Sequence, residues 1–238
     1  MERRSRWALG WRELAYAVVG TVLYGAAIWL TDFLRLPSAL NVNIKPAVLV
    51  PIFGFVYGPV VGLVVGFAGN ALGDVFTASG FVWNWHLGSG LVGLVSGLAG
   101  LRMHHYASRR DLLLATGWAV LGIAVGMGFA SCSDFLMGEA DQYAAWYNLF
   151  LPTFLSDSVN AIVLVPILLY NYGQPGAGGA GQSILITTLL SSLVPLAFLG
   201  FLTVQGYSQA ASGARGHLGG PAAAVPADQK VRIKNIRE

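Results

Sequence analysis

Charge is the first thing that this 238-residue sequence lacks. Asp, Glu, Lys and Arg make up only 11% of its residues, whereas a soluble domain typically carries about 25%. Apolar residues make up 55%, and the mean hydropathy is +0.62. This composition excludes a soluble globular domain, and we predict an all-α integral membrane protein.

Cysteine and metal-binding patterns are also scarce. Cys132 is the only cysteine, so an intramolecular disulfide is excluded and a thiolate metal site is not expected. His104 and His105 lie side by side in a basic segment, where solvated interfacial side chains are the better interpretation. We therefore expect no metal site.

Nucleotide and catalytic motifs are missing too. The sequence has no Gly-x-x-x-x-Gly-Lys-Ser/Thr P-loop, so any ATP-driven work must come from a partner. Residues 176–181 match the dinucleotide pattern Gly-x-Gly-x-x-Gly, but they lie in a low-complexity linker rather than after a strand. No nucleophile stands at a readable spacing from a base and an orienting acid. We expect no cofactor and no enzymatic activity of the chain's own.

What the sequence does contain is a series of long apolar runs. In the membrane domain, we expect them at about residues 11–33, 45–57, 58–74, 87–101, 112–137 and 146–170, with a loop at 77–86. The whole chain then divides into a basic N-terminus, a six-helix membrane domain, a Gly-rich linker, an additional transmembrane or re-entrant helix and a flexible polar tail, at residues 1–10, 11–172, 173–182, 183–205 and 206–238.

Two of these runs allow more than one interpretation. The first is about 20 residues long, enough to span a membrane, so a retained helix is preferred to a signal peptide, which its basic lead and small residues would also fit. The run from Lys45 to Tyr57 is short and contains two prolines, so it is kinked, tilted or partly re-entrant.

Basic residues predict the direction of each crossing. Four arginines within the first twelve residues mark a cytoplasmic N-terminus, and after four crossings the basic segment 102–110 returns to the same side. The acidic segment 138–143 and the loop at 77–86 then lie outside. Seven crossings would leave the basic tail outside, so six crossings with a peripheral or re-entrant last segment are the alternative. Either way, we expect a multi-pass protein of the cell membrane.

Small residues recur at every fourth position in two of the expected helices. The two rows are Gly58, Gly62 and Gly66, and Ala17, Thr21 and Gly25. In a membrane, such rows let helix backbones approach closely. We interpret both rows as faces that dock a partner, and contact within this chain is the alternative.

Polar residues are rare and costly inside a membrane, and this sequence places several at one depth. They come from three outer helix segments and from the loop above them: Asn70, Asp74, Asp134, Asp157 and Asn160, with Trp83, Asn84, Trp85 and His86. We predict that these residues form an outward-facing pocket for a small, partly aromatic or cationic solute, which stacks on the rings and bonds to the carboxylates and amides. Taken singly, each has a plainer interpretation, such as an interfacial anchor.

Three stretches resemble the substrate-binding S component of energy-coupling factor (ECF) transporters. They are Pro51 to Asp74, with its Gly-Pro-x-x-Gly-x-x-x-Gly and Gly-Asp patterns, Gly90 to Gly100, and Pro152 to Pro166. The resemblance covers about residues 11–172. It implies a six-helix substrate-binding domain that holds a vitamin or related micronutrient near the outer face. It also implies delivery by toppling on a T component driven by two ATPases.

Two functions from different classes follow from these observations. The resemblance predicts a high-affinity, membrane-embedded binding subunit for vitamin uptake, energised by a separate T component and two ATPase subunits. Its family docks through an Ala-x-x-x-Ala motif, for which Ala17, Thr21 and Gly25 are the nearest match here. The alternative is a membrane sensor or structural protein with an S-component-like bundle. Thiamin-like, pyrimidine and flavin solutes fit the predicted lining equally well, and we expect no nucleic-acid partner.

Overall fold

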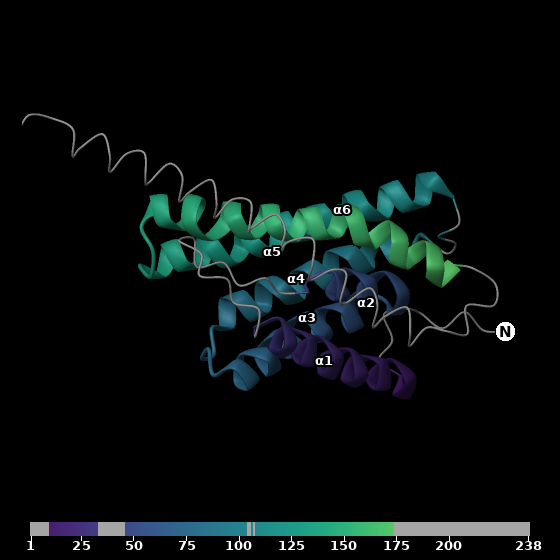
Figure 1. Ribbon diagram of the computed structural model, residues 1–238, viewed down its shortest axis with the longest axis horizontal. Coiled ribbons are helices and arrows are strands. Elements are labelled where there is room, and N and C mark those ends of the chain that lie inside the picture. The colour runs from purple at the N-terminus through teal and green to yellow at the C-terminus, as the bar shows by residue number, and fades with distance from the viewer. Residues whose placement is uncertain (1–9, 33–45, 104–105, 107, 174–238) are drawn as a thin grey trace, which may run out of the picture. The chain divides into compact units, whose positions relative to one another are not determined.

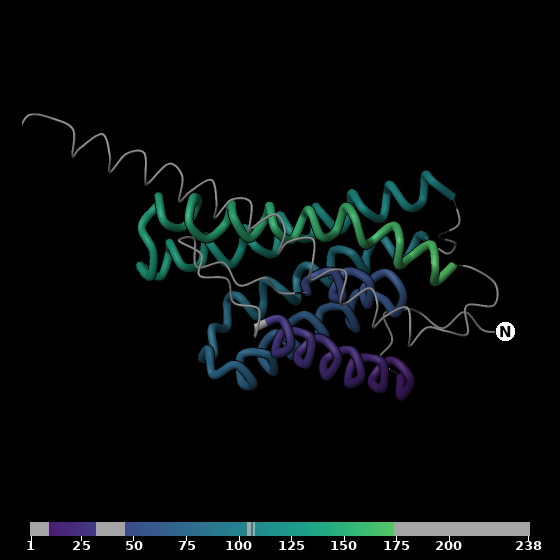
Figure 2. Tube along the Cα trace, viewed as in Figure 1, coloured from purple at the N-terminus to yellow at the C-terminus, as the bar shows by residue number. Residues whose placement is uncertain are grey.

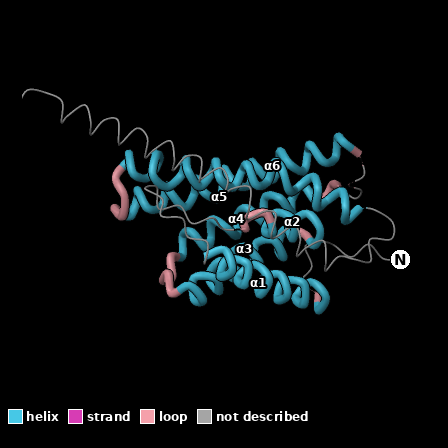
Figure 3. Tube along the Cα trace, viewed as in Figure 1, coloured by secondary structure: helices cyan, strands magenta, loops and turns pink. Residues whose placement is uncertain are grey.

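The described part of the chain is helical and contains no strand (Figures 1 and 3). The computed structural model describes residues 10–32, 46–103, 106 and 108–173. Its helices are α1 (Trp11–Asp32), α2 (Leu49–Tyr57), α3 (Pro59–Thr77), α4 (Trp83–Gly100), α5 (Arg109–Met137), the π-helix η1 (Ala144–Phe150) and α6 (Leu151–Gly173). The predicted all-α membrane class with six helices is confirmed. The predicted linker, seventh apolar run and tail lie outside the described residues.

Length and composition separate the long helices from the short one. Four helical stretches are long and apolar enough to cross a membrane, namely α1, α3, α5 and η1 together with α6. Helix α2 has only nine residues, which at 1.5 Å per residue is about 13 Å, less than half of a bilayer core of about 30 Å. The short segment expected between Lys45 and Tyr57 is therefore present.

Contacts between the helices show which of them run parallel and which run antiparallel. Gly20 of α1 faces Val65 of α3, and Gly25 of α1 faces Leu72 further along α3, so these two helices run parallel. Helix α4 runs antiparallel to both α3 and α5 (Figure 2). The chain therefore returns to the side of its start before α3 begins, as the predicted even number of crossings requires.

Four tyrosines gather where α1 and α5 begin and α2, α4 and α6 end. Tyr16 stacks on Tyr57 with ring centroids 4.2 Å apart, and Tyr106 makes an edge contact with Tyr172 at 6.5 Å. The buried hydroxyl of Tyr106 also donates to the carbonyl oxygen of Phe55 at 2.9 Å. We call this region the tyrosine end. In the predicted topology it faces the cytoplasm.

Helix α4 packs against α2, α3 and α5 (Figure 1). Glycines make this possible. A Cβ atom on Gly62 of α3 would lie 2.5 Å from the carbonyl oxygen of Gly93, and one on Gly88 would lie 2.6 Å from that of Gly126 on α5. Real Cβ atoms do not approach so closely, so both contacts depend on glycine.

The start of α4 corrects one prediction. The segment 77–86 is not a loop throughout, because α3 continues to Thr77 and α4 already begins at Trp83. Tryptophan and polar side chains such as those at 83–86 are common at the membrane interface, so the segment considered alone did not reveal where the helix begins. In the structure, α3 and α5 supply hydrogen-bond partners for these side chains, which no single segment can reveal.

Candidate binding pocket

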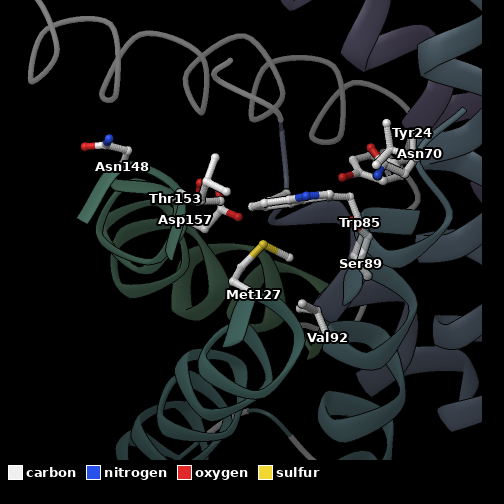
Figure 4. A pocket seen from close by; sticks show the side chains of 13 residues that line it. Tyr24, Asn70, Trp85, Ser89, Val92, Met127, Asn148, Thr153 and Asp157 are labelled. Carbon is white, nitrogen blue, oxygen red and sulfur yellow. The ribbon is translucent and has the colours of Figure 1, made fainter. Parts of the chain in front are cut away.

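A cavity of about 370 Å³ lies between the helices, toward the end opposite the tyrosine end (Figure 4). Every helix contributes to its wall. The lining residues are Tyr24, Ala47, Val50, Asn70, Val82, Trp85, Ser89, Val92, Met127, Asn148, Leu149, Thr153 and Asp157. In Figure 4 the indole ring of Trp85 lies between Asp157 and Asn70, with Met127 below it. The cavity therefore combines a broad aromatic surface with polar groups at its sides.

Helical periodicity explains two of the walls. Trp85, Ser89 and Val92 follow one another at spacings of four and three residues, so they share one face of α4. Thr153 and Asp157 are likewise four residues apart on α6. Each of these two helices thus turns a single stripe toward the cavity.

Three of the nine residues predicted for the site line this cavity: Asn70, Trp85 and Asp157. The prediction omitted Ser89 and Thr153, although each lies one helical turn from a predicted residue, which is a usable signal. It also omitted Tyr24 and Asn148, which also line the cavity. The apolar and aromatic segments around these two residues contain no comparable signal.

Asp134, near the end of α5, binds the first turn of α4 with both of its carboxylate oxygens. The indole N–H of Trp85 donates to Oδ2 at 2.9 Å, and the side-chain amide of Asn84 donates to Oδ1. The same amide also donates to the carbonyl oxygen of Ala130 at 3.1 Å. Asn84 and Asp134 are both buried, and neither lines the cavity.

His86 makes the corresponding connection on the other side of α4. Its ring has no exposed surface. Atom Nδ1 lies 3.2 Å from Nδ2 of Asn70 and 3.7 Å from Oδ2 of Asp74, both on α3. Atom Nε2 accepts the backbone N–H of Val82 at 3.2 Å, just before α4 begins. Both ring nitrogens are therefore engaged, and the ring adjoins an amide that lines the cavity.

The remaining predicted residues lie beside the cavity rather than in its wall. The ring of Trp83 is about half exposed and meets Phe129 edge to face at 6.4 Å. Asn160 is 1% exposed, one turn beyond Asp157, and its amide atoms have no hydrogen-bond partner among the described residues. Ligand contact by either residue stays a prediction. No group of three or more His, Cys, Asp or Glu in the described ranges stands together as a metal site.

A π-helix, η1, forms part of the cavity wall through Asn148 and Leu149. In η1 the backbone hydrogen bonds shift by one residue, and the N–H of Leu151 accordingly bonds to the carbonyl oxygen of Trp146. Pro152 follows at once, and a proline has no N–H and crowds the carbonyl four residues before it. That carbonyl belongs to Asn148, which lines the cavity. The proline thus offers a local reason for the wider turn.

Helices of this chain cover both rows of small residues. Gly62 and Gly66 face α4, and a Cβ atom on Gly25 would lie 3.0 Å from the side chain of Leu72 on α3. Ala17 is only 1% exposed. The alternative of contact within the chain therefore describes this arrangement. The docking of a partner on these rows, which include Gly58 and Thr21, stays a prediction.

A helical bundle with four apolar spans indicates a multi-pass membrane protein, and this one contains a cavity of small-molecule size. Residues 11–174 match the model of the family described as "ECF-type riboflavin transporter, S component", and the chain belongs to this family. The resemblance drawn from the sequence is confirmed. The family consists of transporter components rather than enzymes, so the chain is a membrane-embedded, substrate-binding subunit of a transporter.

Curated relatives cover the same region. A UPF0397 protein of Vibrio atlanticus is 33% identical over 132 residues, which are 53% of this chain and 71% of the relative. A UPF0397 protein of Streptococcus thermophilus is 30% identical over 144 residues, 59% of this chain and 79% of the relative. No solved structure matches the chain.

Proposed function

We propose that this subunit binds a small vitamin for uptake, with riboflavin as the first candidate. The cavity carries the proposal, because its volume of about 370 Å³ falls within the range of about 300–1,000 Å³ typical of small-molecule sites. Trp85 and Tyr24 offer aromatic surface to a flat solute, and Asn70 and Asp157 offer polar groups to its edge. The family description favours a flavin over thiamin-like or pyrimidine solutes.

We place the cavity on the outer side of the cell membrane and the N-terminus in the cytoplasm. Arg12 lies at the start of α1, Arg102 just after α4 and Arg109 at the start of α5, so these bases share the tyrosine end. The acidic residues Glu139 and Asp141 lie at the other end, between α5 and η1. An excess of Arg and Lys on cytoplasmic segments supports this orientation.

Energy for uptake comes, in this proposal, from a T component and two ATPase subunits. The sequence has no P-loop of its own, and the family is named for a component of a larger transporter. Co-expression with such a module should yield a complex that copurifies and takes up labelled riboflavin only with ATP. ATP-dependent uptake by the chain alone would contradict this part of the proposal.

The binding proposal is tested by titrating the purified protein with riboflavin and following quenching of the flavin fluorescence. Trp85→Ala removes the aromatic wall and should weaken binding by about 10- to 100-fold, the scale of one stacking contact with its buried area. Trp11→Ala is the matched control, because Trp11 is exposed at the start of α1 and does not line the cavity. It should change the Kd less than about twofold.

A membrane sensor or structural protein is the competing function. The paired polar groups that join α3, α4 and α5 would serve it equally well by locking the helices together. This competing function is favoured if no flavin, thiamin or pyrimidine raises the thermal unfolding midpoint of the protein and no ATPase module copurifies with it. Equal loss of binding in the Trp11 and Trp85 variants would also remove the case for this cavity.

A further inference from the structure

The first turn of α4 sends three consecutive side chains in three directions. Asn84 points to α5, Trp85 lines the cavity and His86 points to α3. Successive residues of a helix are about 100° apart, so one turn can serve two neighbouring helices and the cavity between them. Only Trp85 of the three lines the cavity. The orientation of its ring therefore depends on what holds it from outside.

Asp134 is the group that holds this ring. Its Oδ2 atom accepts the indole N–H at 2.9 Å, and its Oδ1 atom accepts the amide of Asn84. The carboxylate is 7% exposed and lies outside the cavity wall. Both of its oxygens thus accept hydrogen bonds from donors of the protein, which restrains the indole ring through its N–H.

The position of Asp134 is itself well determined. Its backbone carbonyl oxygen accepts the N–H groups of Gly138, Glu139 and Ala140, with the Glu139 bond at 2.9 Å. These bonds end α5, and Gly138 has a φ of +76°, which favours glycine. The carboxylate therefore projects from a fixed helix end onto a ring that would otherwise rotate about two side-chain torsions.

We propose that Asp134 is a positioning residue, which fixes the plane of the Trp85 ring for stacking and does not itself contact the solute. This inference rests on the proposed function, because it assumes that the cavity takes a flat solute. It revises the sequence-based expectation that Asp134 belongs to the ligand-contacting set. Binding energy then depends on Asp134 only through Trp85, which makes the two residues strongly coupled.

A double-mutant cycle with riboflavin as the probe tests this coupling. Asp134→Ala should weaken binding about 10-fold when Trp85 is present, and less than about twofold in a Trp85→Phe background, because phenylalanine has no N–H to hold. Asp134→Asn keeps an acceptor oxygen and should recover part of the loss. Ser133→Ala is the control, since within the described ranges that hydroxyl donates to Phe129 of its own helix. Equal losses in both backgrounds would overturn the proposal.

A second readout needs no solute. The seven tryptophans give separate indole N–H signals in a ¹⁵N spectrum, and the Trp85→Phe spectrum identifies the one from Trp85. That signal should exchange slowly with solvent in the unmodified protein and in Asp134→Asn, and rapidly in Asp134→Ala. Slow exchange in all three would overturn the positioning role. If the unmodified protein binds no riboflavin, the proposed function fails, while this signal still decides whether Asp134 holds the ring.

Discussion

The Nδ1 atom of His86 on α4 lies 3.2 Å from the side-chain amide of Asn70 on α3. The imidazole has no exposed surface, whereas the amide lines the cavity. The relation repeats that of Asp134 to Trp85: a buried polar group outside the cavity fixes a group that faces it. Asn70 and Trp85 line the cavity, and His86 and Asp134 lie behind them. Substitutions of the two residues behind the wall should therefore affect solute binding without direct contact with the solute.

Removing His86 should therefore affect both stability and binding. His86→Ala removes the buried ring that adjoins the amide of Asn70 and accepts the N–H of Val82, and we expect a loss of about 1–3 kcal/mol. For a chain of this size, each kcal/mol lowers the thermal midpoint by about 2–4 °C. His86→Gln, which keeps a donor and an acceptor, should lose less in a detergent melting experiment. An unchanged midpoint for His86→Ala would contradict the hydrogen bonds described.

Space, rather than polarity, should decide the outcome at the glycines. Gly62→Ala places a methyl group 2.5 Å from the carbonyl oxygen of Gly93, so α3 and α4 must separate. We expect a loss of about 1–3 kcal/mol, measured as a lower thermal midpoint or a smaller folded yield. Gly117→Ala on α5 is the matched control, because nothing lies within 4 Å of the added methyl group. Equal midpoints for the two variants would show that α3 and α4 do not approach so closely.

The proline after η1 should control the part of the cavity wall that η1 supplies. Pro152→Ala supplies an N–H that can bond to the carbonyl of Asn148 in a regular α-helix, so the π-helical turn should be lost. Asn148 then moves relative to the solute, and we expect the riboflavin Kd to rise about three- to tenfold. Pro166→Ala, inside α6 and away from the cavity, should leave the Kd unchanged. Backbone hydrogen exchange of residues 144–152 should slow in Pro152→Ala and not in Pro166→Ala. Slower exchange in Pro166→Ala alone would contradict this explanation.

The tyrosine end should contribute to stability without taking part in binding. Tyr106→Phe removes the hydroxyl that donates to the carbonyl oxygen of Phe55, and a bond of this kind contributes about 1 kcal/mol. The thermal midpoint should fall while the riboflavin Kd stays the same. Tyr172→Phe alters an exposed side chain and is the control. A large change in Kd for Tyr106→Phe would mean that the two ends of the bundle are coupled.

Helix positions were the most predictable part of this protein. The expected runs at 11–33 and 112–137 lie close to α1 and α5. The site was less predictable. Asn70, Trp85 and Asp157 reach the cavity, but the segment at 83–86 was taken for a loop. The segment belongs to α4, and its side chains bond to residues 16 and 50 positions away in the sequence.

Composition and spacing alone determined that the chain is an all-α membrane protein, since apolar length and rows of small residues are local properties, and the motifs between Pro51 and Pro166 carried the resemblance to the S-component family. Only the tertiary structure decided which polar residues face the cavity and which hold them in place. Asn84, Trp85 and His86 are consecutive, yet they bond to α5, line the cavity and bond to α3 respectively. A helix turns about 100° per residue, so the role of each side chain depends on which neighbouring helix lies in its direction.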